Sequence, residues 1–201
     1  SIDIKSFFEE NFFFIKKIRK KAIKNLLLKP GDRVIDAGCG SGGSFRYLLE
    51  HVGSSGEIVG IDISPGTIIN TNKRIDKNSW INVTAIEANA QSVKLNGQFN
   101  GLLMFAAPDI FASEDSLNNI LPYLKENARV AFFGAKVSKK KIGWILNGPL
   151  RFAFSKLSFK TGPQLEEKPC KISDRYTLDI EVKGYFFGWR FLACGDGCSS
   201  D

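Results

Sequence analysis

Residues 34–43, VIDAGCGSGG, decide the fold of this 201-residue chain. The apolar start of the stretch predicts a short buried strand, and the glycines after it predict a loop that opens a helix. Glycines at this point let the backbone approach a ligand closely. The glycines of this stretch fit two different sequence motifs. GxGxxG from Gly38 is the fingerprint of dinucleotide sites, whereas DxGxGxG from Asp36 sets a carboxylate in front of the glycines.

Strands and helices alternate outward from this loop. Strands are predicted at residues 33–38, 56–63, 81–89, 99–107 and 128–137, and helices at 6–28, 43–51, 64–77 and 116–127. Such alternation is typical of parallel strands joined by right-handed crossovers. Two further strand-like runs, 176–184 and 185–195, lie too close together for a helical crossover, so one of them must run antiparallel. The sequence therefore predicts an α/β fold with a doubly wound, mostly parallel seven-stranded sheet and helices on both faces.

Asp36 distinguishes two classes of cofactor by charge. The pyrophosphate of a dinucleotide sits at a helix N-terminus, where a carboxylate would repel it. S-adenosylmethionine (SAM) has no phosphate and carries an ammonium and a sulfonium cation, both of which a carboxylate favours. Asp62, at the end of the second strand, is spaced to accept hydrogen bonds from the ribose hydroxyls that both cofactors contain. The charge of Asp36 thus favours SAM and disfavours a nicotinamide-dependent dehydrogenase.

Three motifs in the first half of the chain point to one family. These are LKPGDRVIDAGCGSG at 28–42, GEIVGIDISPGTI at 56–68 and WINVTAIEANAQS at 80–92. They are similar to the first, second and third-strand motifs of class I, Rossmann-like SAM-dependent methyltransferases, and the resemblance covers nearly the whole chain. It implies a seventh strand inserted antiparallel and a single domain over residues 1–201. Within that domain, 1–30 would be an N-terminal cap helix and 138–173 a variable substrate or lid segment.

The resemblance also implies the residues of the cofactor site. They are Asp36, Gly38, Cys39, Gly40, Gly42, Asp62, Ile63, Asn89, Ala90, Phe105 and Ala106. The glycine loop would hold the methionine part of SAM, Asp62 the ribose, and Ile63 and Asn89 the adenine. Asn89 stands where the family usually has Asp, but its amide oxygen can still accept a hydrogen bond from the adenine amino group. Phe105 and Ala106 would line the site of methyl transfer.

Few residues suggest acid–base chemistry. Asp109, in the AAPDIF stretch after the fourth strand, is the best candidate for a catalytic base, and Trp144, Arg151 and Tyr176 are candidate substrate residues. The single histidine, His51, falls at the end of the first crossover helix. It is expected to be structural, because ligands of such sheets bind at the carboxyl ends of the strands. No metal site is expected, since the four cysteines lack zinc-site spacing and have no histidine nearby.

The distribution of charge does not identify the methyl acceptor. The net charge is +7, and basic residues concentrate in IKKIRKKAIK, residues 15–24, and in the aromatic segment 136–160. These segments suit a lipid-like anionic amphiphile, a peripheral membrane contact or RNA, and a solvated basic face explains them equally well. The preferred hypothesis is a cytoplasmic SAM-dependent methyltransferase that yields S-adenosylhomocysteine (SAH) and acts on a small hydrophobic or amphipathic molecule. An RNA methyltransferase and a non-catalytic SAM-binding regulatory protein are the alternatives.

Overall fold

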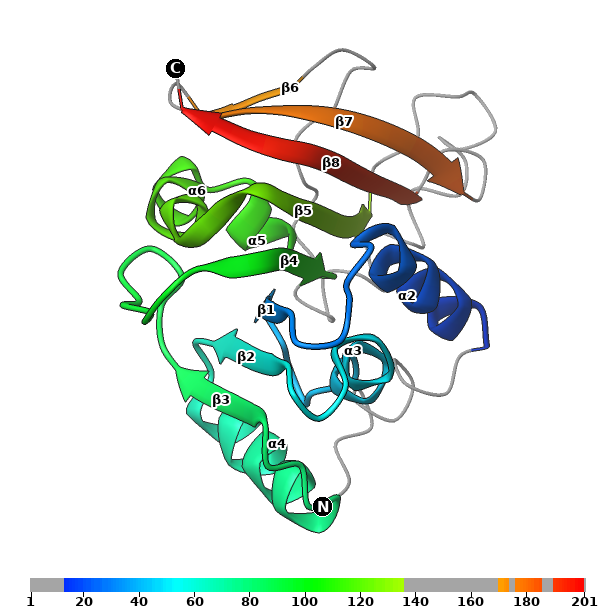
Figure 1. The fold of residues 1–201 in the computed structure, drawn as a ribbon, viewed down its shortest axis with the longest axis vertical. Coiled ribbons are helices and arrows are strands. Elements are labelled where there is room, and N and C mark those ends of the chain that lie inside the picture. Colours follow the sequence, from blue (N-terminus) through cyan, green and yellow to red (C-terminus); the bar gives the residue numbers. More distant parts are fainter. Residues whose placement is uncertain (1–12, 136–169, 174–175, 186–189, 201) are drawn as a thin grey trace, which may run out of the picture.

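A computed structural model of the chain describes residues 13–135, 170–173, 176–185 and 190–200 (Figure 1). Its helices are α2 (Phe13–Asn25), α3 (Phe45–Val52), α4 (Pro65–Lys77), α5 (Pro108–Phe111), α6 (Glu114–Ile120) and the 3-10 turn η1 (Leu121–Tyr123). Its strands are β1 (Arg33–Ala37), β2 (Glu57–Asp62), β3 (Val83–Glu87), β4 (Phe99–Phe105), β5 (Leu124–Ala135), β6 (Cys170–Ser173), β7 (Tyr176–Tyr185) and β8 (Arg190–Ser200). None of these described helices has the length and apolar character needed to cross a membrane.

The strands form one sheet in the order β3-β2-β1-β4-β5-β8-β7-β6. Strands β1 to β5 pair in parallel, and β8 runs antiparallel between β5 and β7. Figure 1 shows the arrow of β8 pointing opposite to those of β5 and β7. The predicted α/β class, the parallel central sheet and the antiparallel last strand are confirmed.

The strand count differs from the prediction, because the part of the chain that the structure describes forms a sheet of eight strands, where seven were predicted. The additional strand is β6, which pairs antiparallel with the beginning of β7 at the edge of the sheet. Its four residues, CKIS, were assigned by sequence to the variable segment 138–173. So short a run has no periodicity of its own, and its strand conformation depends on a partner that only the fold supplies.

Some boundaries also differ. The helix predicted at 116–127 ends at Ile120, and β5 already begins at Leu124. Pro122 explains the early end, because proline cannot continue a helix interior. The predicted break at Gly184 is wrong as well, since β7 continues through Tyr185 and β8 begins at Arg190.

The core consists of two apolar layers, one on each face of the sheet. Side chains alternate along the strands, so Val34 and Ile58 contribute to one layer and Ile35 and Val59 to the other. Helices α2, α3 and α4 cover the first layer, and α5 and α6 cover the second. This arrangement confirms helices on both faces and holds the carboxyl ends of β1 to β4 in register.

Candidate functional site

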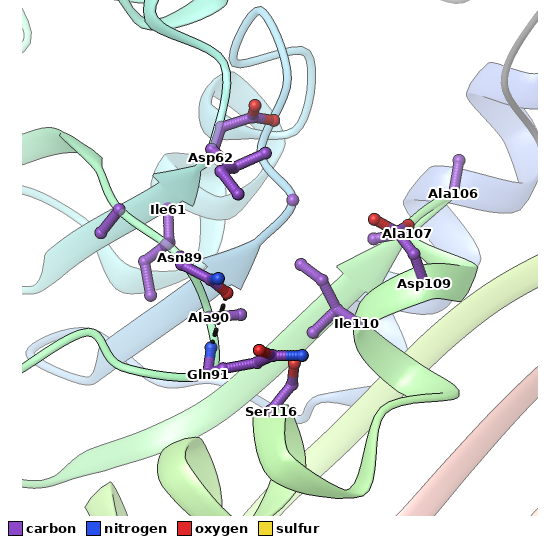
Figure 2. A pocket seen from close by; sticks show the side chains of 13 residues that line it. Ile61, Asp62, Asn89, Ala90, Gln91, Ala106, Ala107, Asp109, Ile110 and Ser116 are labelled. Atoms are coloured by element: carbon purple, nitrogen blue, oxygen red, sulfur yellow. Dashed lines mark hydrogen bonds between the residues drawn. The ribbon is translucent and has the colours of Figure 1, made fainter.

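A cavity of about 420 Å³ lies at the carboxyl ends of β1 to β4. The sheet order reverses there, because the chain runs from β1 outward to β3 and then returns to β4 on the other side of β1. Open α/β sheets bind ligands at such a switch point. The lining residues are Gly38, Ile61, Asp62, Ile63, Ala88, Asn89, Ala90, Gln91, Ala106, Ala107, Asp109, Ile110 and Ser116. Figure 2 shows Asp62 and Asn89 on one side, Ala106 and Asp109 on the other, and Ile110 between them.

The loop after β1 brings the backbone close to the wall that follows β4. Gly38 has φ +75°, and a Cβ added to it would lie 2.5 Å from the Cβ of Ala107. The N–H groups of Gly38 and Cys39 both donate to the carbonyl of Ile61, at 2.8 and 3.0 Å. Only glycine combines this dihedral angle with so close an approach. The loop is therefore tied to β2 and placed directly against the first residues of α5.

Asp62, the last residue of β2, organises the upper rim of the cavity. Its Oδ2 accepts a hydrogen bond from the N–H of Gly40, and its Oδ1 accepts one from the N–H of Ser64, both at 3.0 Å. A carboxylate has about four acceptor sites, so Asp62 can also accept from two hydroxyl groups of a ligand. Ser64 holds the predicted N-cap position of α4, but its hydroxyl accepts from Thr67 Oγ1 and makes no capping bond to the backbone.

The same side of the cavity also carries an apolar surface and amide groups. Ile63 lines the cavity and remains 66% exposed, which offers an apolar face to a planar ring. The side-chain oxygen of Asn89 accepts from the N–H of Gln91 at 2.9 Å, the dashed contact in Figure 2. Gln91 in turn donates to the hydroxyl of Ser113, which caps α6. Asn89 is thereby held in place and keeps acceptor capacity for a ligand.

The wall after β4 carries the candidate base. Ala106 has φ +62°, an uncommon angle for a residue with a Cβ, and its N–H donates to the carbonyl of Phe133 at 2.9 Å. Asp109 lies exposed in the first turn of α5 and lines the cavity. Backbone strain of this kind often accompanies functional sites. The arrangement places one solvent-accessible carboxylate beside the end of β4.

Behind the glycine loop lies a buried charged pair. Asp36 is 1% exposed and Arg19, from α2, is 7% exposed. Burial raises the pKa of Asp36 from 3.8 to about 7, while the nearby Arg19 guanidinium and Ser44 hydroxyl lower it. Neither carboxylate oxygen of Asp36 has a partner at hydrogen-bonding geometry. Burial also raises the pKa of the Cys39 thiol, so this cysteine stays protonated and is no nucleophile.

The raised pKa of Asp36 predicts a pH-dependent stability. Between pH 4 and 7 the folded protein binds a proton at Asp36 that the unfolded chain has already lost, so this group destabilises the fold as pH rises through that range. We expect Asp36→Asn to gain stability relative to wild type by about 1 kcal/mol or more between pH 5 and pH 8. Urea denaturation at both pH values measures this, with the exposed Asp76→Asn as control. An equal pH dependence in wild type and Asp36→Asn would contradict the prediction.

The structure places about half of the predicted residues in the cavity lining. Gly38, Asp62, Ile63, Asn89, Ala90, Ala106 and Asp109 line it. Asp36, Cys39, Gly40, Gly42 and Phe105 belong to the adjoining loop and strand ends but not to the lining. Trp144 and Arg151 lie outside the described residues.

Tyr176 is not brought to the cavity. It begins β7 and pairs with Ser200, and β7 runs parallel to β5 because both are antiparallel to β8. Tyr176 therefore lies at the amino edge of the sheet, opposite to the cavity. Strand β6 is the reason, because it carries the chain to that edge before β7 starts.

Sequence reasoning missed several lining residues, among them Gln91 and Ser116, and it did not foresee the burial of Arg19. Gln91 lies inside the motif at 80–92, directly after Asn89 and Ala90, but the resemblance assigned it no role. Arg19 appeared only as one of several cations in a basic helix, and nothing in its local pattern separates it from its neighbours.

The sequence profile of a family described as "Methyltransferase domain" matches residues 28–140. Two curated relatives are each 31% identical to the chain. The aklanonic acid methyltransferase of Streptomyces sp. (strain C5) aligns over 51% of this chain and 47% of its own length. The 2-phytyl-1,4-naphtoquinone methyltransferase of Nostoc sp. (strain PCC 7120) aligns over 56% of this chain and 51% of its own length. The chain thus spans about half the length of the curated relatives it matches.

Solved structures share the fold at low identity. Geranyl diphosphate C-methyltransferase from Streptomyces coelicolor superposes with a TM-score of 0.71 and 13% identity, covering 90% of this chain and 76% of that one. A SAM-dependent methyltransferase from Aquifex aeolicus superposes with a TM-score of 0.61 and 17% identity, covering 89% of this chain and 88% of that one. These likenesses establish the Rossmann-like methyltransferase architecture.

Proposed function

This chain belongs to the methyltransferase domain family, and we propose that it transfers a methyl group from SAM to a small, hydrophobic or amphipathic acceptor. The observation that carries the proposal is the pairing of two carboxylates with one glycine loop. Asp36 lies buried behind the loop, and Asp62 holds the loop by the N–H of Gly40. This combination suits a cationic nucleoside and opposes an anionic pyrophosphate.

The residues present fit SAM on chemical grounds. The buried carboxylate of Asp36 has unsatisfied oxygens, which a cationic group would complement. Asp62 has acceptor capacity for the ribose hydroxyls, Ile63 offers an apolar face for the adenine, and Asn89 and Ala90 lie at the rim for its polar edge. We propose that these residues, with Gly38, Cys39, Gly40 and Gly42, hold the cofactor.

SAM supplies an activated methyl group, so the protein has to position an acceptor atom and exclude water. Phe105 ends β4 and Ala106 follows it at the cavity, and Phe105 stacks on Phe133 at 4.8 Å between ring centroids. This stack packs the end of β4 against β5 behind the cavity lining. Asp109, exposed at the same edge, is the group we propose to accept a proton from the acceptor.

The small-molecule acceptor is supported by the relatives and by the lining. The names of the relatives specify aklanonic acid, a phytyl naphthoquinone and geranyl diphosphate as their substrates, each with a large apolar part. In this chain the wall beside Asp109 is formed by Ala106, Ala107 and Ile110, which suits an apolar molecule.

Calorimetric titration with SAM, SAH and NADH tests the proposal. We expect micromolar binding of SAM and SAH and none of NADH, followed by methyl transfer from labelled SAM to a panel of quinones, polyketide acids and prenyl compounds. Binding of NADH in place of SAM would overturn the assignment. SAM binding with transfer only to RNA, in a steeply salt-dependent reaction, would favour the RNA alternative. SAM binding without transfer to either class would favour a regulatory protein.

A further inference from the structure

The outer side of helix α2 carries only basic charge. Its exposed cations recur at a spacing that places them on one side of the helix, and α2 contains no acidic residue. The other side belongs to the core, where Ile18, Ala22 and Ile23 are at most 2% exposed. We call the exposed side the lysine face, and it consists of Lys16, Lys17, Lys20, Lys21 and Lys24.

The basic surface continues onto α3, which packs against α2. The ring centroid of Tyr47, on α3, lies 5.0 Å from Lys20 Nζ and 4.5 Å from the guanidinium carbon of the exposed Arg46. Glu50 lies 4.0 Å from Lys20 Nζ and offsets one of these charges. Both side chains of that ion pair are more than half exposed, so water and salt screen it. The surface therefore keeps a strong net positive charge.

An exposed leucine follows the lysine face. Leu27 lies just after α2, where its N–H donates to the carbonyl of Lys24 at 3.2 Å, and it is 60% exposed. Its φ is +48°, a left-handed conformation that glycine or asparagine adopts with less strain at the end of a helix. Leucine is thus an unfavourable residue for the free protein at this position, because its backbone is strained and most of its apolar side chain stays in water.

These features fit an anionic lipid bilayer better than RNA. A bilayer presents a broad layer of negative charge, which attracts clusters of lysines without requiring a groove. Recognition of RNA relies on aromatic rings or arginines on which bases stack, and the exposed side chains of α2 between Ile15 and Asn25 include neither. Leu27 adds an apolar side chain of the kind that enters the membrane interface beside basic residues.

We propose that the lysine face and Leu27 dock the protein on the surface of a membrane that contains anionic lipids. The apolar side of α2 is part of the core, so the helix lies on the bilayer and does not insert into it. The docking surface is separate from the cavity, since none of its residues belongs to the described lining. Docking goes beyond methyl transfer, and it brings the protein to the place where a hydrophobic acceptor concentrates.

Sedimentation with vesicles tests the role of charge. We expect wild type to bind vesicles of equal parts phosphatidylglycerol and phosphatidylcholine but not vesicles of phosphatidylcholine alone, and to dissociate as salt rises from about 0.05 M to about 0.5 M. Each lysine near such a surface strengthens binding roughly fivefold, so the double variant Lys16→Gln, Lys24→Gln should bind about 25-fold more weakly. The matched control is Lys73→Gln, Lys77→Gln, which removes the same charge from the exposed side of α4 and should stay within about threefold of wild type.

Leu27→Asn separates docking from folding. Asparagine tolerates the left-handed conformation, so this variant should resist urea at least as well as wild type, yet bind the anionic vesicles about tenfold more weakly.

The proposal is wrong if Leu27→Asn binds vesicles like wild type, or if the two double variants are weakened equally. It also fails if wild type ignores anionic vesicles and binds a fluorescent single-stranded RNA instead. Calorimetry with SAH, which needs no membrane, tests the proposed function independently in every variant.

Discussion

Replacing Asp62 by alanine will lower the affinity for SAH at least about 100-fold. Two charge-assisted hydrogen bonds to ribose hydroxyls would be lost, and each is worth about 1.5–3 kcal/mol. The loop would suffer as well, because Asp62 accepts from the N–H groups of Gly40 and Ser64 at 3.0 Å. Without it, the donor of Gly40 has no carboxylate to keep it in place beside β2.

Calorimetry with SAH measures this effect, and circular dichroism confirms that the variant is folded. Asp76→Ala is the matched control, since Asp76 is a carboxylate exposed on α4 and should bind SAH like wild type. An Asp62→Ala affinity within threefold of wild type would show that Asp62 is only the tether of the loop. The ribose would then have to be bound elsewhere.

Replacing Gly38 by alanine is the second large effect, and we expect a loss of about 3 kcal/mol in the free energy of unfolding. At φ +75° a residue with a Cβ is strained by roughly 1–2 kcal/mol. The new methyl group would also lie 2.5 Å from the Cβ of Ala107 and 3.3 Å from Cδ1 of Ile110, which forces the start of α5 away from the loop at about 1–3 kcal/mol. The same displacement deforms the cavity, so SAH binding should fall at least about tenfold.

Gly66→Ala is the control for this substitution. Gly66 lies in the first turn of α4, and a Cβ there would meet nothing within 4 Å. The Gly66→Ala variant should be as stable as wild type or slightly more stable, because alanine is a better helix former than glycine. Urea denaturation compares the two variants. If Gly38→Ala were as stable as Gly66→Ala, the close contact between the loop and α5 would not exist in solution.

The central fold was predictable because its signals are local. Short apolar runs predict β1 to β5, and strands separated by helices dictate parallel pairing. The ends of strands were predictable for the same reason, and this placed Asp62, Asn89 and Asp109 correctly at one edge of the sheet. The C-terminal strands were harder. Strand β6 is short and depends on its partner, and the start of β7 at Tyr176 lies at the far edge.

By itself the sequence determined the α/β class, the glycine loop and the two carboxylates that favour a cationic nucleoside, since each depends on spacing within a few dozen residues. Only the tertiary structure decided which cation of a basic helix is buried against the glycine loop. Arg19 reaches Phe105 and Gly43 because α2 packs across the ends of distant strands. Helical periodicity distinguishes a buried face from an exposed one, but it carries no information about what that face is packed against. That is why the buried pair of Arg19 and Asp36 emerges only from the folded molecule.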